Sequence, residues 1–240
     1  MAFIRIKNDS STVLIDDEYV NLCVAEQGVF VLSGTTSVGA RFGTISYTSN
    51  SPYPPMLALQ FPYFHTVVAY TRLDNTHTWH VSAASAAGGR QGTYFIFDVP
   101  AARLPGTGLV VMRNAQGEAT FDSDGRYMRV DGFFQNQMTD QPGSADLVPG
   151  RTYAVAHASA AFFNERRLAP SPPNPGNPSA PGPWFYIDDA EQFGYAISGA
   201  QLSWGRFPYH SGQFQLPRPG MGSSVRSSRA AAMVIDVTGY

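Results

Sequence analysis

The sequence has little cysteine and no excess of positive charge, and each shortage excludes a class of protein. Its 240 residues contain one cysteine, Cys23, which excludes an internal disulfide. Cys23 lies in an apolar run, so we expect it to pack as a small hydrophobic side chain. Eighteen acidic and sixteen basic residues give a formal net charge of −2. Binding through counterion release needs clustered cations, so we expect no nucleic-acid partner.

Long apolar runs are also missing. The sequence has no apolar stretch of about eighteen residues, the length that a membrane-spanning helix needs. We therefore expect no membrane insertion. The first residues, "MAFIRIKND", lack the basic start, apolar core and small-residue cleavage site of a signal peptide. We expect synthesis and folding in the cytoplasm.

Helical periodicity is absent too, because no window of a dozen residues keeps an apolar i, i+3, i+4, i+7 stripe. Short apolar or alternating runs recur instead between clusters of Gly, Pro, Asn, Asp and Ser, which is typical of strands joined by turns. The sequence predicts an all-β fold, a β-sandwich with long Pro/Gly-rich loops. The expected strands are 3–7, 12–15, 19–25, 29–32, 44–48, 56–60, 66–72, 77–82, 93–99, 108–113, 119–122, 127–134, 152–157, 184–188, 194–198, 201–204 and 231–238.

A proline-rich segment separates the first 168 residues from the C-terminal part of the chain. Residues 169–183, "APSPPNPGNPSAPGP", contain seven prolines, so this segment predicts an extended polyproline-like loop or arm. It is either a floppy insertion or an arm ordered on a neighbouring subunit. We expect a β-sandwich domain over 1–168, the arm over 169–183, and strands over 184–240 that complete the sandwich or form a small second subdomain. Within the last part, 207–229 predicts an irregular excursion.

Metal-ligand patterns are weak. His77 and His80 have the H-x-x-H spacing, but residues three apart on a strand point to opposite faces. The run "DSDGR" at 122–126 lacks the later Glu of a calcium loop. We expect it to form a hairpin turn between 119–122 and 127–130, because Asp-Gly favours such turns. The sequence predicts no metal site.

Catalytic patterns are equally weak. No serine lies in a G-x-S-x-G elbow, and "GTGLVV" at 106–111 lacks the lysine of a phosphate-binding loop. We expect no enzyme, no catalytic residue and no cofactor. A glycoside hydrolase in a β fold would need a converging acid pair, for which Asp74 with Asp98 or Glu165 are arbitrary choices.

Aromatic residues are abundant, with twelve Tyr, sixteen Phe and three Trp. A sandwich core uses most of them, and those near Pro and Gly supply contact surfaces. The candidate interface residues are Phe134, Trp184, Trp204, Pro173 and Pro175. An alternative function, a receptor- or glycan-binding module, would use the loop aromatics Tyr63, Phe64 and Tyr209 as stacking platforms.

The N-terminal stretch "FIRIKNDSSTVLIDD" predicts a hairpin with a polar turn at 8–11 and a second strand ending at Asp16. Its acidic residues would cap turns and protect an exposed edge. The same stretch resembles the start of small tail-tip proteins of long-tailed, siphovirus-like bacteriophages. The matching residues are Ile4, Ile6, Asn8, Asp9, Val13, Leu14, Ile15, Asp16, Tyr19 and Asn21.

Two further segments resemble the same proteins: "VMRNAQGEATFDSDGRYMRV" at 111–130 and "MVIDVTGY" at 233–240. The resemblance implies a virion structural protein of the tail tip or baseplate. Its partners would be other tail proteins and further copies of itself, with a trimer favoured, and it would lie near a host cell-surface receptor. The family has no catalytic motif to carry over.

Overall fold

The computed structural model describes residues 5–7, 13–16, 21–100, 110–114, 117, 119–138, 141–168, 184–216, 223–226 and 229–240. These residues form an all-β structure, which confirms the predicted fold class. Among the elements of the described chain, the helical one is the 3-10 turn at Ser85–Ala87.

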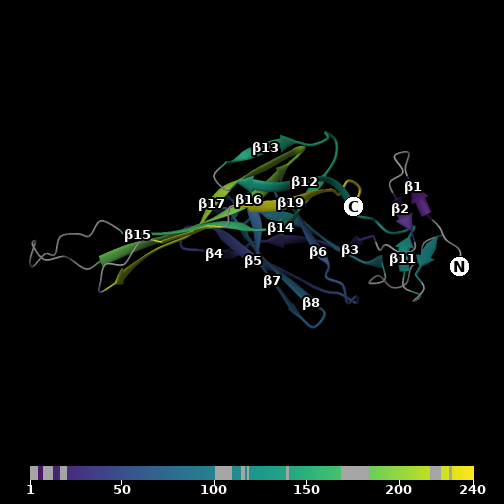
Figure 1. Cartoon of the computed structure of the whole chain (residues 1–240), viewed down its shortest axis with the longest axis horizontal. Helices are drawn as coiled ribbons and strands as arrows, with labels where there is room; N and C mark the ends of the chain where they lie inside the picture. Colours follow the sequence, from purple (N-terminus) through teal and green to yellow (C-terminus); the bar gives the residue numbers. More distant parts are fainter. Residues whose placement is uncertain are drawn as a thin grey trace, which may run out of the picture.

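Two antiparallel sheets form the body of the molecule (Figure 1). The first sheet has the order β12-β19-β14-β6-β9-β3, with β3 Cys23–Val31, β6 Met56–Gln60, β9 Gln91–Asp98, β12 Arg129–Met138, β14 Tyr153–Ser159 and β19 Arg229–Asp236. The second has the order β13-β17-β16-β7-β8-β5-β4, with β4 Gly34–Thr35, β5 Arg41–Thr48, β7 His65–Leu73, β8 Thr76–Ala83, β13 Gly143–Asp146, β16 Trp184–Ser198 and β17 Gln201–Leu216. Beside β16 lies β15 (Ala161–Leu168), which also pairs with β18 (Ser223–Arg226).

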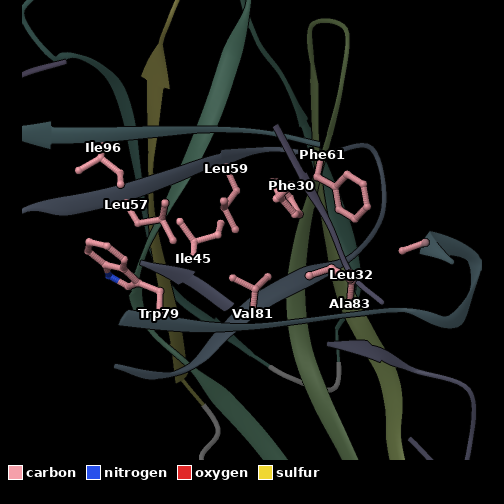
Figure 2. Packing of buried hydrophobic residues seen from close by; sticks show 11 residues of the cluster. Phe30, Leu32, Ile45, Leu57, Leu59, Phe61, Trp79, Val81, Ala83 and Ile96 are labelled. Atoms are coloured by element: carbon pink, nitrogen blue, oxygen red, sulfur yellow. The ribbon is translucent and has the colours of Figure 1, made fainter. Parts of the chain in front are cut away.

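The core lies between the two sheets because their strands alternate apolar and polar residues. On β8, Trp79 and Val81 are buried, whereas the intervening His80 is only half-buried. Figure 2 shows Trp79 and Val81 facing Leu57 and Leu59 of β6 across the layer. The opposite face of the first sheet is also apolar, because Ala58, Phe95, Phe97, Ala154, Ala156, Ile235 and Val237 form a separate buried cluster there.

The strand order of each sheet is symmetric about its centre, apart from the short β4 at one edge of the second sheet. In chain order, β3, β5, β6, β7, β8 and β9 alternate between the two sheets in the same way as β12, β13, β14, β16, β17 and β19. The two halves meet at antiparallel contacts, Leu59 with Val155 in one sheet and His65 with Tyr195 in the other. A pseudo-two-fold axis therefore passes between these pairs. Residues 184–240 supply β16, β17 and β19 to the same two sheets as the preceding residues.

The second half departs from this symmetry by an arm. β16 and β17 continue well past the body, and β15 and β18 lie alongside them, so the strands β18-β15-β16-β17 form the arm. In Figure 1 the end of β15 points away from the sandwich, at the left. The prediction of an irregular excursion over 207–229 is therefore wrong for 207–216, which belong to β17, and for 223–226, which form β18. Pro208 fits within β17 at a register shift, where a missing N–H is tolerated.

Short hairpins lie within two of the three segments that carry the resemblance. β1 (Arg5–Lys7) pairs with β2 (Val13–Asp16), as the alternating pattern predicts. β10 (Val111–Arg113) pairs with β11 (Ala119–Asp122). The prediction that β11 pairs with 127–130 is wrong, since the turn at 122–125 instead leads into β12, which pairs with β19.

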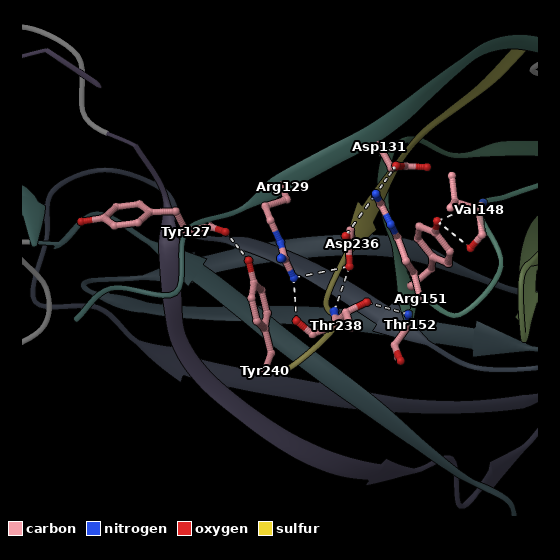
Figure 3. Close-up of polar contacts among 10 residues, drawn as sticks. Tyr127, Arg129, Asp131, Val148, Arg151, Thr152, Asp236, Thr238 and Tyr240 are labelled. Atoms are coloured by element: carbon pink, nitrogen blue, oxygen red, sulfur yellow. Dashed lines mark hydrogen bonds and ion pairs between the residues drawn. The ribbon is translucent and has the colours of Figure 1, made fainter. Parts of the chain in front are cut away.

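Polar contacts fasten the C-terminal segment to the first sheet (Figure 3). Asp236 lies 3.4 Å from both Arg129 on β12 and Arg151 before β14. Burial raises the pKa of Asp236, but its hydrogen bonds with Thr238 and the two Arg charges outweigh burial and lower it. The Tyr240 hydroxyl donates to the Tyr127 carbonyl, and the Arg129 guanidinium lies over the Tyr240 ring. The segment 233–240 therefore has a structural role here.

Candidate interaction surfaces

The arm is an exposed ladder with paired charges. Arg166 lies directly opposite Asp188, with 3.6 Å between their charged atoms, and Arg167 reaches Asp189 at 3.1 Å. The Ser211 hydroxyl donates to Asp189 over 2.6 Å, and this hydrogen bond, together with Arg167, lowers the pKa of Asp189. Exposed pairs of this kind add little stability. They give the arm a defined charge pattern instead.

Apolar side chains are exposed beside these charges. Phe162 on β15 is 45% exposed and Val225 on β18 is 60% exposed. Val225 pairs with Asn164, two residues from Phe162, so the two apolar side chains share one face of the arm as diagonal neighbours. An exposed aromatic and a branched aliphatic side chain side by side suit contact with another protein.

A polar cleft lies at the root of the arm. Its cavity of about 480 Å³ is lined by Phe163, Glu165, Asp189, Glu191 and Arg206, among others. The pair Arg206–Glu191, at 3.0 Å, closes one part of it.

The turn residue Ser37 fastens the arm to the first half of the chain. Its hydroxyl donates to the Ser211 carbonyl over 2.9 Å, and the Ser211 amide lies 3.2 Å from the same hydroxyl.

The loop aromatics separate into two places. Tyr63 and Phe64 line a cavity of about 300 Å³ together with Ala84, Ala196 and Ser203. Tyr209 lies on β17 and lines another cavity of about 300 Å³ with Phe42 and His80. The structure therefore brings Tyr63 and Phe64 together, and it places Tyr209 at a different cleft.

A further cleft opens between the two sheets. It holds about 300 Å³ and is lined by Pro54, Pro55, Met56, Leu57, Val67, Tyr70, Trp79 and His157. The Tyr70 and Trp79 rings lie 5.7 Å apart, and Tyr70 is 43% exposed. The Tyr70 hydroxyl hydrogen-bonds His77, which fixes its ring at the mouth of the cleft.

Four rings meet at the pseudo-two-fold axis. His65 touches Phe61, His157 touches Tyr195, and the two histidine rings lie 5.1 Å apart. Phe61 and His157 hold equivalent places, two residues after Leu59 and Val155. The pseudo-two-fold axis therefore relates the apolar ring of Phe61 to the imidazole ring of His157.

The polar atoms of this cluster are poorly satisfied. His65 Nδ1 hydrogen-bonds the Tyr63 carbonyl at 2.9 Å, but its Nε2, both nitrogens of His157 and the Tyr195 hydroxyl are buried without a partner. Burial lowers the pKa of His65 to about 4, opposed by the Tyr63 hydrogen bond. Burial, then the neighbouring His65, lowers the pKa of His157 well below its usual value.

The predicted interface residues have different surroundings. Phe134 and Trp204 lie 6.0 Å apart and pack against the core of the second half, so much of their area already stabilises the fold. Trp184 begins β16, opposite Leu216, at the outer end of the arm, and its side chain is not among those described. Pro173 and Pro175 lie outside the described residues.

The structure separates the candidate chemical groups. His77 shares the buried face of β8 with Trp79, whereas His80 lies on the other face, as the strand period predicts. Asp74 occupies the tip of the β7–β8 hairpin, and Glu165 lies on the arm. Cys23 is buried.

Asp98 has a structural environment. It is fully buried at the end of β9 and accepts hydrogen bonds from Ser49 at 2.6 Å and Tyr47 at 3.2 Å. Among the described residues, no group of three or more His, Cys, Asp or Glu is placed to hold a metal ion. Within the same residues, no helix has the length and apolar character to cross a membrane.

Sequence reasoning missed β15 and the cleft at Tyr70. The run "AFFNERRL" at 161–168 alternates too weakly to predict a strand, because both faces of the arm carry polar residues. The signal that could have found the cleft is the pair of aromatic residues Tyr70 and Trp79, which lie close together on the paired strands β7 and β8.

Comparison with known proteins identifies no relative. No family model matches the chain, and none of the curated proteins or solved structures matches it. The resemblance of the three short segments to tail-tip proteins therefore stays a hypothesis.

Proposed function

We propose that the protein is a virion structural protein of a bacteriophage tail tip or baseplate, which assembles in several copies with other tail proteins. The observation that supports assembly most strongly is the arm. A ladder that leaves the sandwich and exposes Phe162 and Val225 has a surface suited to a neighbouring subunit. The tail-tip location rests on the resemblance of the three segments.

The proposal explains the arrangement of rigid and exposed parts. The packed sheets hold the arm in one direction, because β16 and β17 belong both to the core of the second half and to the arm. A subunit anchored in this way fixes the spacing of its neighbours. No chemical step is needed for this role, and the protein would act as a non-enzymatic component.

The test is self-association of a double variant on the arm. Phe162→Ser with Val225→Ser should abolish oligomers that the wild-type chain forms, measured by size-exclusion chromatography with light scattering. The matched control is Val29→Ser, because Val29 is 61% exposed on β3, away from the arm. Loss of oligomers in the control alone, or unchanged oligomers in the double variant, would contradict the role of the arm.

A second candidate function is binding of a host receptor or glycan, which the cavity at Tyr63 and Phe64 favours. Aromatic side chains beside small residues form platforms on which sugar rings stack. Tyr63→Ala with Phe64→Ala should then abolish saturable binding of the purified protein to host cells, and Tyr209→Ala should leave it intact. Equal binding by all of these proteins would exclude the cavity as the receptor site.

A further inference from the structure

The cleft between the two sheets at Tyr70 and Trp79 is built to receive a chain segment. Its walls come from both sheets: Met56 and Leu57 from β6, Tyr70 from β7 and Trp79 from β8. Leu57 and Trp79 are buried, whereas Tyr70 and Pro54 are exposed. The cleft therefore has a closed apolar floor and an accessible rim, the form of a groove that binds a peptide.

The cleft also has an unused polar group. His157 lines it, and both His157 ring nitrogens are buried without a hydrogen-bond partner. A neutral imidazole has one N–H donor and one acceptor. A buried donor without a partner costs free energy, and a carbonyl brought by a ligand would recover it.

The charge of the cleft restricts the ligand. Its lining contains no Asp, Glu, Lys or Arg. The cleft at the root of the arm differs, because Glu165, Asp189, Glu191 and Arg206 line it. An uncharged segment with free carbonyl groups and apolar rings therefore suits the cleft at Tyr70.

Residues 169–183 of the chain have this chemistry. The segment "APSPPNPGNPSAPGP" has no charged residue, and seven of its fifteen positions are proline. Proline-rich segments favour the polyproline II conformation, whose carbonyls have no internal hydrogen bonds, and they dock into grooves lined by aromatic side chains. The segment connects β15, which ends at Leu168, to β16, which begins at Trp184, at the outer end of the arm.

We infer that the proline-rich segment 169–183 of one copy docks into the cleft at Tyr70, Trp79 and His157 of a second copy. The inference deepens the proposed function, on which it rests, by naming the receiving surface. The arm and the β7–β8 hairpin point in different directions from the body (Figure 1), which favours a neighbouring copy over the segment's own chain. Prolyl rings would lie against Tyr70 and Pro54, and a segment carbonyl would accept the His157 N–H once the buried imidazole turns toward the cleft.

The experiment uses a synthetic peptide of residues 169–183. Its binding is measured by calorimetry against a protein in which a short Gly-Ser linker replaces 169–183, so that the chain cannot supply its own segment. The full-length chain serves as a competitor. Tyr70→Ala should weaken peptide binding on the order of tenfold, the effect expected of an aromatic anchor. His157→Phe, which copies the ring at the equivalent Phe61, should weaken it without emptying the cluster of rings.

Matched controls distinguish binding in the cleft from non-specific binding of the peptide. Tyr63→Ala removes an aromatic side chain from a different cleft and should leave binding unchanged. A peptide with Pro172, Pro173 and Pro175 replaced by Ala should bind much more weakly. The inference is overturned if the natural peptide does not bind at about 1 mM, or if Tyr63→Ala weakens it as much as Tyr70→Ala.

The inference and the proposed function can fail separately. If the peptide does not bind but Phe162→Ser with Val225→Ser still abolishes oligomers, the docking inference is wrong and arm-mediated assembly stands. If the peptide binds but the arm variant leaves oligomers unchanged, the docking surface stands and the role of the arm's apolar face is wrong.

Discussion

Acid should destabilise the protein through the histidines at the pseudo-two-fold axis. His65 is fully buried with a pKa of about 4, below the ordinary 6.5, so the folded state disfavours its charged form. The unfolded chain therefore binds more protons than the folded chain between those two values. The stability that this group contributes is fully present above pH 6.5 and is lost as the pH falls toward 4.

The magnitude follows from the shift. Each unit of pH in this window costs about 1.36 kcal/mol for one histidine, so His65 alone removes about 2 kcal/mol at pH 5. His157 acts in the same direction. The effect is a large fraction of a net stability that is typically about 5–15 kcal/mol. We expect protonation to weaken first the contacts between the two halves, Leu59–Val155 and His65–Tyr195.

Urea unfolding followed by tryptophan fluorescence at pH 7, 6 and 5 measures this effect. Between pH 7 and 5, the wild-type protein should lose about 2 kcal/mol more than His65→Gln, whose amide can still donate to the Tyr63 carbonyl. His80→Gln is the matched control and should follow the wild type. Parallel stability curves for the wild type and His65→Gln would refute the reasoning, because acid loss would then come from other groups.

The remaining predictions concern packing and can be checked by the same unfolding measurements at pH 7. Gly194→Ala should destabilise the protein by about 1–3 kcal/mol, because a Cβ there would lie 2.6 Å from the His65 carbonyl oxygen. Unchanged stability would mean that β7 and β16 can move apart there at little cost. Asp98→Ala should cost about 1–3 kcal/mol by leaving the buried Ser49 hydroxyl without its acceptor, and unchanged stability would contradict that. Leu59→Ala should cost about 2–5 kcal/mol, since its side chain is fully buried, and a loss below 1 kcal/mol would argue against a close-packed core.

The positions of many strands can be predicted from local sequence patterns, but the full length of the longest strands cannot. The run at 56–60 becomes β6 with the expected ends, because its apolar residues are bounded by turn residues. The sequence predicts separate strands at 184–188 and 194–198, whereas β16 runs through both of them. Between them, Asp189 bonds to Arg167 of β15 and Ser211 of β17, and Glu191 pairs with Arg206 of β17, contacts that no local pattern reveals.

The candidate sites depend on contacts between distant residues. The sequence places Tyr63 and Phe64 next to proline, which predicts a loop position, and the structure places both at one cavity. The meeting of His65 with His157 joins residues 92 positions apart, on strands of opposite sheets. The symmetric strand order of the two sheets could not be predicted either. The two halves share a topology, but their sequences differ at the axis, where Phe61 of the first half corresponds to His157 of the second.

The most direct test of the central claim is immunogold electron microscopy of purified phage particles with an antibody raised against this chain. We expect label at the distal end of the tail, with several gold particles at one tip, because the proposed arm contacts would join several copies. Label on the head or along the shaft would contradict the tail-tip assignment. Particles without label, with the protein recovered free in the lysate, would contradict a structural role in the virion.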